Sequence, residues 1–107
     1  MGLRPIPRRL LPDSCVVRER TDGGGYGEGR RIDHVRFERK QSWLGEAHRW
    51  ADAGAGTLFV DAVMSVGAFE VEAGSLVEIG GRSLLVASVA RLEGTGGRVH
   101  HWELELR

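Results

Sequence analysis

The stretch Gly74-Ser-Leu-Val-Glu-Ile-Gly-Gly-Arg-Ser-Leu-Leu-Val-Ala-Ser-Val89 decides the fold of this chain. Two short apolar runs flank Gly80-Gly81. A tight two-residue hairpin needs such a pair, because a residue without a Cβ adopts a positive φ at little cost. A third run, Val99-His-His-Trp-Glu-Leu-Glu-Leu106, follows a glycine-rich turn at 94–97. The chain is therefore predicted to end in a small antiparallel sheet.

Similar short runs lie upstream of this sheet. With 107 residues, sixteen of them glycine, the chain favours one domain built from strands and tight turns. The prediction is an all-β fold, a small antiparallel β-barrel of five to six strands spanning residues 1–107. Ile32 is out of phase with Val35, which predicts either a bulge or fraying of the strand there. The expected strands are 14–20, 30–38, 56–61, 74–79, 82–92 and 98–106.

The predicted core consists of the alternating apolar positions of these strands, because successive strand residues point to opposite faces. The core residues are expected to be Val17, Val35, Phe37, Leu58, Val60, Val77, Ile79, Leu84, Val86, Trp102, Leu104 and Leu106.

Residues 2–12 are predicted to form an extended N-terminal arm. Its three prolines fix φ and remove backbone donors, which disfavours both a helix and a central strand. The arm also carries apolar side chains, including Leu10 and Leu11. An extended apolar segment of this kind is expected to pack either on its own domain or on a neighbouring subunit.

Residues 41–55 are predicted to form a long loop, since they show no strand alternation. They contain Trp43 and Trp50, which are costly to expose. These side chains either fold back over the core or anchor a contact with another protein, because Trp and Arg dominate binding hot spots. The candidate subunit-interface residues of the arm and loop are Pro5, Pro7, Leu10, Leu11, Trp43, Leu44, Arg49 and Trp50.

No constellation in the sequence predicts catalysis. Residues 23–29 are rich in glycine but precede a strand-like run, whereas a phosphate loop precedes a helix. His100 and His101 are neighbours on a strand and should point to opposite faces, which disfavours a shared metal ion. Asp61 is expected to cap a turn, and the lone Cys15 to be a small buried residue. We therefore predict no enzyme activity and no catalytic, cofactor-binding or metal-binding residues.

The formal charge is zero but unevenly distributed. Residues 1–50 hold eleven Lys and Arg against seven Asp and Glu, and residues 51–107 hold four against eight. This asymmetry suits head-to-tail contact between copies, although opposite charges facing each other within one fold would give the same pattern. An alternative function is a small barrel that binds single-stranded nucleic acid by stacking Tyr26, Trp43 or Trp50 on bases. The zero net charge disfavours it.

Targeting signals are not evident. Residues 1–12 lack the continuous apolar core of a signal peptide, and no run approaches the roughly 20 apolar residues that cross a bilayer. We expect synthesis in the cytoplasm and no membrane partner.

Taken in order, several segments resemble the minor capsid proteins of tailed bacteriophages and prophages, which accompany head-completion and stopper proteins. These segments are Pro5-Ile-Pro-Arg-Arg-Leu-Leu-Pro-Asp-Ser14, His34-Val-Arg-Phe-Glu38, Leu58-Phe-Val-Asp-Ala-Val-Met-Ser65, Gly74-Ser-Leu-Val-Glu-Ile-Gly-Gly-Arg82 and His100-His-Trp-Glu-Leu-Glu-Leu106.

This resemblance implies a structural virion protein that forms a β-barrel and assembles into a homo-oligomeric ring at the neck. Its partners would be the portal–adaptor assembly on one side and the tail on the other, and assembly would occur in the bacterial host cytoplasm. Related stoppers carry a loop that points into the channel and helps retain packaged DNA, and residues 41–55 are the matching segment. The resemblance leaves open a stopper, adaptor-like or tail-completion position.

Overall fold

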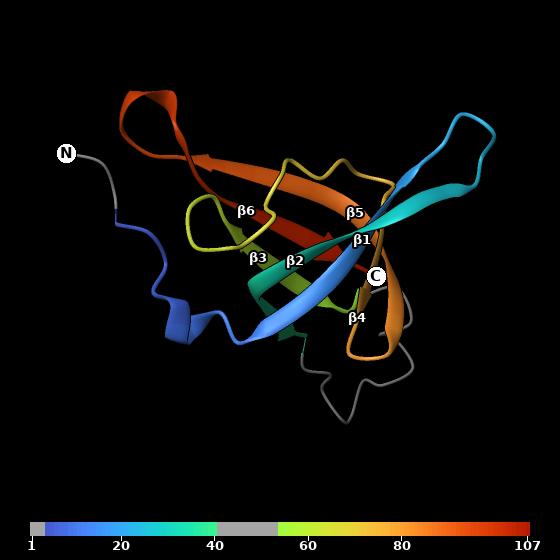
Figure 1. The fold of residues 1–107 in the computed structure, drawn as a ribbon, viewed down its shortest axis with the longest axis horizontal. Helices are drawn as coiled ribbons and strands as arrows, with labels where there is room; N and C mark the ends of the chain where they lie inside the picture. Colours follow the sequence, from blue (N-terminus) through green and yellow to red (C-terminus); the bar gives the residue numbers. More distant parts are fainter. Residues whose placement is uncertain (1–3, 41–53) are drawn as a thin grey trace.

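The computed structural model describes residues 4–40 and 54–107 (Figure 1). Its strands form a closed antiparallel barrel in the order β1-β2-β3-β6-β5-β4, which confirms the predicted all-β barrel. The strands are β1 (Asp13–Arg20), β2 (Tyr26–Arg39), β3 (Gly56–Asp61), β4 (Leu76–Ile79), β5 (Arg82–Glu93) and β6 (Val99–Leu106); two 3-10 turns, η1 (Arg8–Leu10) and η3 (Thr95–Gly97), accompany them.

The predicted Gly80-Gly81 hairpin joins β4 to β5. Ile79 pairs directly with Arg82, and the two glycines have φ angles of 58° and 77°. Both angles lie in the left-handed region that a residue with a Cβ seldom adopts. The glycine pair therefore sets the register of the sheet at the end of the chain.

Two strands differ from their expected bounds by more than one residue at one end. β2 begins at Tyr26 instead of residue 30, because Arg20 pairs with Tyr26 and Arg18 with Gly29, so residues 26–29 of the glycine-rich segment belong to the strand. β4 begins at Leu76 instead of residue 74, because Gly74 has a φ of 93° and leaves the strand conformation.

Of the two predicted alternatives in β2, a bulge or fraying, the structure shows a bulge, at His34. Asp13 pairs with Val35 and Ser14 with Asp33, so His34 is the extra residue opposite β1. Its φ is 61°, a conformation in which His is more common than most residues with a Cβ. The bulge lets Ile32 and Val35 both face the interior, where neither is exposed.

The barrel interior contains the predicted core. Each predicted core residue is buried except Phe37, which is partly buried and packs against the cluster. The Arg39 guanidinium lies 5.9 Å from the centre of the Phe37 ring. The buried cluster also contains Ile32 and Val71, which strand alternation alone did not predict.

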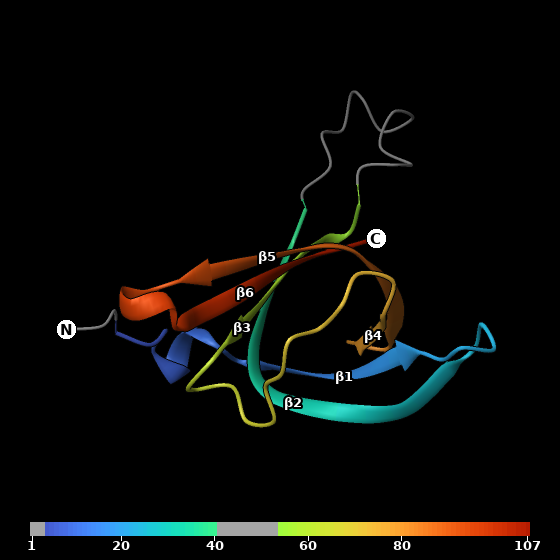
Figure 2. The ribbon, with the colours of Figure 1, turned by 90° about the horizontal axis from the view of Figure 1, so that it is seen from above.

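Val71 reaches the core from the long connection between β3 and β4. In Figure 2 this connection passes between the β5–β6 side of the barrel and the β1–β2 side. The Glu70 carboxylate accepts hydrogen bonds from the Trp102 indole at 3.2 Å and from Arg91 at 3.0 Å. The Arg30 guanidinium stacks 3.5 Å above the Phe69 ring. Residues 69–71 therefore fix this connection to three strands of the barrel.

Candidate assembly interface

The N-terminal arm packs on its own barrel, which is one of the two expected alternatives. The arm is extended apart from η1, in which Leu10 N–H bonds to the Pro7 carbonyl at 2.9 Å and Leu11 N–H to the Arg8 carbonyl at 3.0 Å. This turn is compatible with the arm's prolines because Pro5, Pro7 and Pro12 lie outside it.

The arm's interface candidates differ in exposure. Leu11 is completely buried by its own chain, whereas Leu10 is 42% exposed and Pro5 and Pro7 are also exposed. In this fold, a neighbouring molecule can therefore touch Pro5, Pro7 and Leu10, but not Leu11. Leu10 borders an open groove of about 320 Å³ that is lined by Ile6, Leu10, Leu11, Arg36, Glu38 and Phe59.

Asp61, at the end of β3, anchors the arm. Its side chain is completely buried, and one carboxylate oxygen accepts the Ile6 N–H at 2.9 Å. The other oxygen accepts the N–H groups of Val63 and Met64 at 2.9 and 2.8 Å. The predicted turn-capping role is confirmed. The contact with Ile6 was not predictable, because the two residues are 55 positions apart.

The bulge residue His34 makes the second contact with the arm. The Arg8 guanidinium donates from its Nε and Nη2 atoms to His34 Nε2, at 3.0 and 2.7 Å. A guanidinium has no acceptor, so His34 Nε2 is the acceptor in both contacts. The His34 carbonyl accepts the Ser65 hydroxyl, which in turn accepts the Asp61 N–H at 2.9 Å. Bulge, turn and arm thus form one connected network.

The third contact comes from β6. The Arg4 carbonyl accepts a hydrogen bond from His100 Nε2 at 2.5 Å, and His100 Nδ1 lies 2.8 Å from His101 Nδ1. His101 Nε2 contacts the Glu103 carboxylate at 2.9 Å. The two rings therefore connect the arm to the Glu103 carboxylate through a continuous series of polar contacts.

These rings meet although neighbouring residues on a strand point to opposite faces. Their separation of 2.8 Å fits a hydrogen bond, whereas two nitrogens that share a zinc ion at about 2.0–2.1 Å each lie farther apart. Within residues 4–40 and 54–107, no group of three or more His, Cys, Asp or Glu side chains is arranged to hold a metal ion.

The described residues that flank the predicted loop lie at the opposite end of β3 from Asp61. Trp43, Leu44, Arg49 and Trp50 lie outside the described residues. The flanks of the loop are fixed by the Lys40 N–H, which bonds to the Ala55 carbonyl at 2.9 Å, beside the first residue of β3. The arm is anchored at Asp61, the last residue of the same strand. Six strand residues separate these two ends by about 17 Å.

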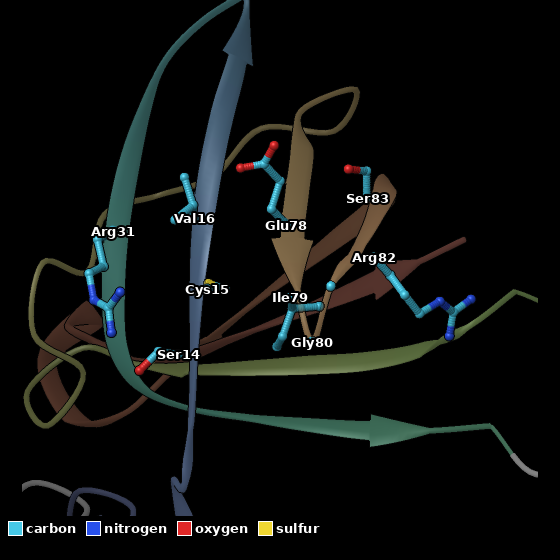
Figure 3. Close-up of a pocket in the computed structure, with 10 residues that line it drawn as sticks. Ser14, Cys15, Val16, Arg31, Glu78, Ile79, Gly80, Arg82 and Ser83 are labelled. Atoms are coloured by element: carbon cyan, nitrogen blue, oxygen red, sulfur yellow. The ribbon is translucent and has the colours of Figure 1, made fainter.

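An open notch of about 390 Å³ lies beside β1 (Figure 3). It exists because β1 pairs with β4 only through Val16–Arg18, so the first residues of β1 diverge from the β4–β5 turn. Arg31 and Arg82 lie on opposite sides of the notch in Figure 3. Arg31 pairs with Asp33 at 2.8 Å, and Glu78 pairs with Arg18 at 3.3 Å.

The notch has no activated nucleophile. Burial raises the pKa of the Cys15 thiol to about 12; the Asp33 charge adds to this shift and the Arg31 charge opposes it. The thiol is therefore protonated at neutral pH, whereas a reactive cysteine needs a lowered pKa. Hydrogen bonds from Ser14 and Arg31 lower the pKa of Asp33, which keeps this carboxylate charged.

Charge is unevenly distributed over the described residues. Residues 4–40, which form the arm, β1 and β2, hold ten Lys and Arg against six Asp and Glu, and residues 54–107, which form β3 to β6, hold four against seven. Within the strands, β1 and β2 together are nearly neutral, with six Arg against five Asp and Glu, whereas β3 to β6 hold two Arg against five. The positive excess therefore lies mainly on the arm, at Arg4, Arg8 and Arg9, and the negative excess on β3 to β6. Arg18 and Glu78 pair across the boundary between β1 and β4, so part of the asymmetry is neutralised within the fold.

The alternative of nucleic-acid binding finds no stacking platform in the described residues. Among their exposed large apolar side chains, Tyr26 is the single aromatic, at 39% exposure. Base stacking along a strand uses several exposed aromatic rings in a basic groove. The described surface therefore favours protein contact over nucleic-acid stacking.

Comparison with known proteins agrees with this conclusion. The family described as minor capsid protein matches residues 7–106. Neither a curated protein nor a solved structure matches the chain significantly. In the described part of the chain, no helix has the length and apolar character needed to cross a bilayer. Because the family match includes the arm from Pro7 and all six strands, the chain belongs to the minor capsid protein family and is a structural protein of the virion.

Proposed function

We propose that this protein is a head–tail connector subunit of a tailed phage or prophage, of the head-completion or stopper type. Copies form a closed ring at the neck, between the portal side and the tail. The family match supports a structural role in the virion, and a family of structural proteins suggests that the role is not enzymatic.

The observation that carries the neck assignment is the position of the two candidate interface segments. The arm is anchored at the last residue of β3, and residues 41–53 leave and rejoin the barrel beside its first residue. A subunit with different segments at its two ends suits a position between two different partners. In this proposal one end contacts the portal side and the other contacts the tail side.

The uneven charge of the chain suits contacts between copies within the ring. The positively charged arm of one copy faces the acidic strands β3 to β6 of the next, because opposite surface charges attract and orient neighbours. Such a heterologous contact closes into a ring when the rotation per subunit divides a full turn. Each contact is weak enough that the free protein is monomeric until the portal side provides a template. The proposal also includes contact between residues 41–55 and packaged DNA.

The test is a phage or prophage strain from which this gene is deleted, with the gene returned on a plasmid. We expect DNA-filled heads without tails, or heads that lose DNA, and rescue by the plasmid. Electron microscopy of wild-type particles should place the protein in a ring at the neck. Normal infectious particles without the gene would refute the connector role, and copies spread over the capsid surface would refute the neck position.

A further inference from the structure

The arm and its docking site form a contact that two copies can exchange. We propose that in the assembled ring the arm of each subunit docks on the barrel of its neighbour, at Asp61, His34 and His100, in place of the neighbour's own arm. This inference rests on the proposed ring and identifies the contact that closes it. The partner is a second copy of this chain.

The docking site on each barrel requires an arm, but that arm can belong to the same chain or to another copy. Asp61 is completely buried, and one of its carboxylate oxygens accepts the arm's Ile6 N–H. His34 accepts Arg8, and His100 donates to the Arg4 carbonyl. Loss of the arm would remove these partners, including the backbone donor to one Asp61 oxygen, while Val63 and Met64 still bond to the other oxygen. A polar group that loses its hydrogen-bond partner is costly unless another partner replaces it. An identical arm from another copy restores each contact.

The arm is joined to the barrel at a single point. Leu11 is the last residue that packs on the barrel with the arm, and Pro12 leads directly into β1 at Asp13. The arm's prolines keep it extended apart from η1, so its nine described residues span about 26 Å. This length exceeds the roughly 17 Å of β3, so an arm that pivots at Pro12 reaches an adjacent barrel.

Exposed apolar side chains around the docked arm indicate a second molecule at this end. Leu10 is 42% exposed in η1, and Val63 and Val66 in the turn after β3 are 71% and 60% exposed. Val63 and Pro5 line the same small cavity of about 190 Å³ beside the arm. An arm docked on its own barrel leaves these side chains in water. A neighbour close enough to exchange arms would cover them, which favours exchange within the ring.

Cross-linking distinguishes exchange from docking within one chain. Leu10 on the arm and Glu38 on β2 line the same groove, and neither side chain holds the arm at Asp61, His34 or His100. Leu10→Cys and Glu38→Cys are combined in a Cys15→Ala background, and purified particles are treated with a short bis-maleimide. Exchange joins each subunit to the next, so we expect covalent multimers on a denaturing gel. The free monomer treated in the same way should give cross-links within one chain.

The control combines Leu10→Cys with Arg82→Cys, because Arg82 is the first residue of β5 after the β4–β5 turn. This turn lies away from the arm (Figure 1). If one copy packed its arm against the β4–β5 turn of another copy without exchange, the reagent would join the two introduced cysteines of the control between the two chains instead. Cross-links confined to single chains, in particles that contain the protein in normal amount, would refute arm exchange without contradicting the proposed ring. Absence of the protein from particles would refute the proposed function itself. Unchanged melting temperatures of the variants show that each one folds.

Discussion

At the scale of single residues, Asp61 connects parts of the chain that are distant in sequence. Its carboxylate holds the turn after β3 through Val63 and Met64, and it holds the arm through Ile6. A strand end, a turn and the arm therefore depend on one buried side chain. The network continues through Ser65 to the carbonyl of the bulge residue His34.

Asp61→Ala should lower the free energy of unfolding by roughly 2–4 kcal/mol, because three N–H groups lose a charged acceptor. Urea denaturation measures this loss. Trypsin should also cut faster at the arm arginines Arg8 and Arg9. The control, Asp22→Ala in the exposed β1–β2 turn, should change stability by less than about 0.5 kcal/mol. Equal stability of both variants would show that Asp61 does not anchor the arm.

Cys15 makes the free energy of unfolding depend on pH in the alkaline range. Its pKa is raised to about 12 in the folded protein, mainly by burial, whereas the unfolded thiol ionises near its ordinary value of 9.0. The stability that it contributes is fully present below pH 9 and is lost as the pH rises toward 12. The free energy of unfolding should therefore fall more steeply over this range in the wild type than in Cys15→Ala. Parallel pH profiles of the two proteins would contradict the assignment.

At the scale of elements, the turn after β3 approaches β2 so closely that one position excludes a side chain. Asp33 and Val66 exchange two backbone hydrogen bonds at 3.0 and 2.9 Å. The next residue, Gly67, has a φ of 85°, and a Cβ there would lie 2.6 Å from the Arg31 carbonyl oxygen. This approach holds the turn and the bulge together.

A comparison of Gly67→Ala with Gly24→Ala separates the free-energy cost of this close contact from the cost of backbone strain. Gly24 has a similar φ of 88°, but a Cβ there would meet nothing within 4 Å. Each substitution should cost about 1–2 kcal/mol for the left-handed conformation, and Gly67→Ala should cost clearly more because the backbone must move. Thermal and urea unfolding compare the two variants. Equal losses would show that β2 accommodates the added methyl group.

Two leucines on neighbouring strands, Leu104 on β6 and Leu92 on β5, provide another matched pair of substitutions. Leu104 is completely buried, whereas Leu92 on β5 is 37% exposed. Leu104→Ala should cost roughly 2–5 kcal/mol, because it leaves a cavity in the core. Leu92→Ala should cost much less, since a side chain in contact with water leaves no sealed cavity. A loss below about 0.5 kcal/mol for Leu104→Ala would contradict its core position.

At the scale of the whole molecule, the anchor of the arm and the described flanks of residues 41–53 lie at opposite ends of β3. The arm is fixed by contacts from β2, β3 and β6. The flanks of residues 41–53 are fixed by backbone bonds at the other end of β3. A change at one end should therefore leave the fold and the other end intact.

Changing Trp43 and Trp50 together to Ala should leave the melting temperature of the free subunit unchanged and prevent heads from joining tails, or allow DNA to leak. The reason is that large aromatic side chains supply much of the binding energy at protein interfaces. Particle titre and electron microscopy provide the measurement. Exposed Tyr26→Ala, in the β1–β2 hairpin, serves as the control and should give normal particles. Normal particles from the double variant would remove the loop from the mechanism.

Much of the fold follows from local sequence patterns. Gly80-Gly81 predicted the hairpin that the structure shows, and strand alternation predicted the buried residues from Val17 to Leu106, with Phe37 only partly buried. The phase break between Ile32 and Val35 predicted a bulge or fraying, and the structure shows the bulge. These predictions succeed because turn geometry and strand periodicity depend on residues close in sequence.

Closure of the barrel and the anchoring of the arm depend instead on contacts between distant residues. Ile6 meets Asp61, Arg8 meets His34 and Arg4 meets His100 only after β2, β3 and β6 have been placed side by side. The sequence alone determined an all-β chain with a proline-rich arm, because those features are local. Only the tertiary structure decided that Leu11 is buried by its own barrel and that the arm is anchored at the end of β3 opposite the contact between Lys40 and Ala55, because pairing across the barrel has no local signal.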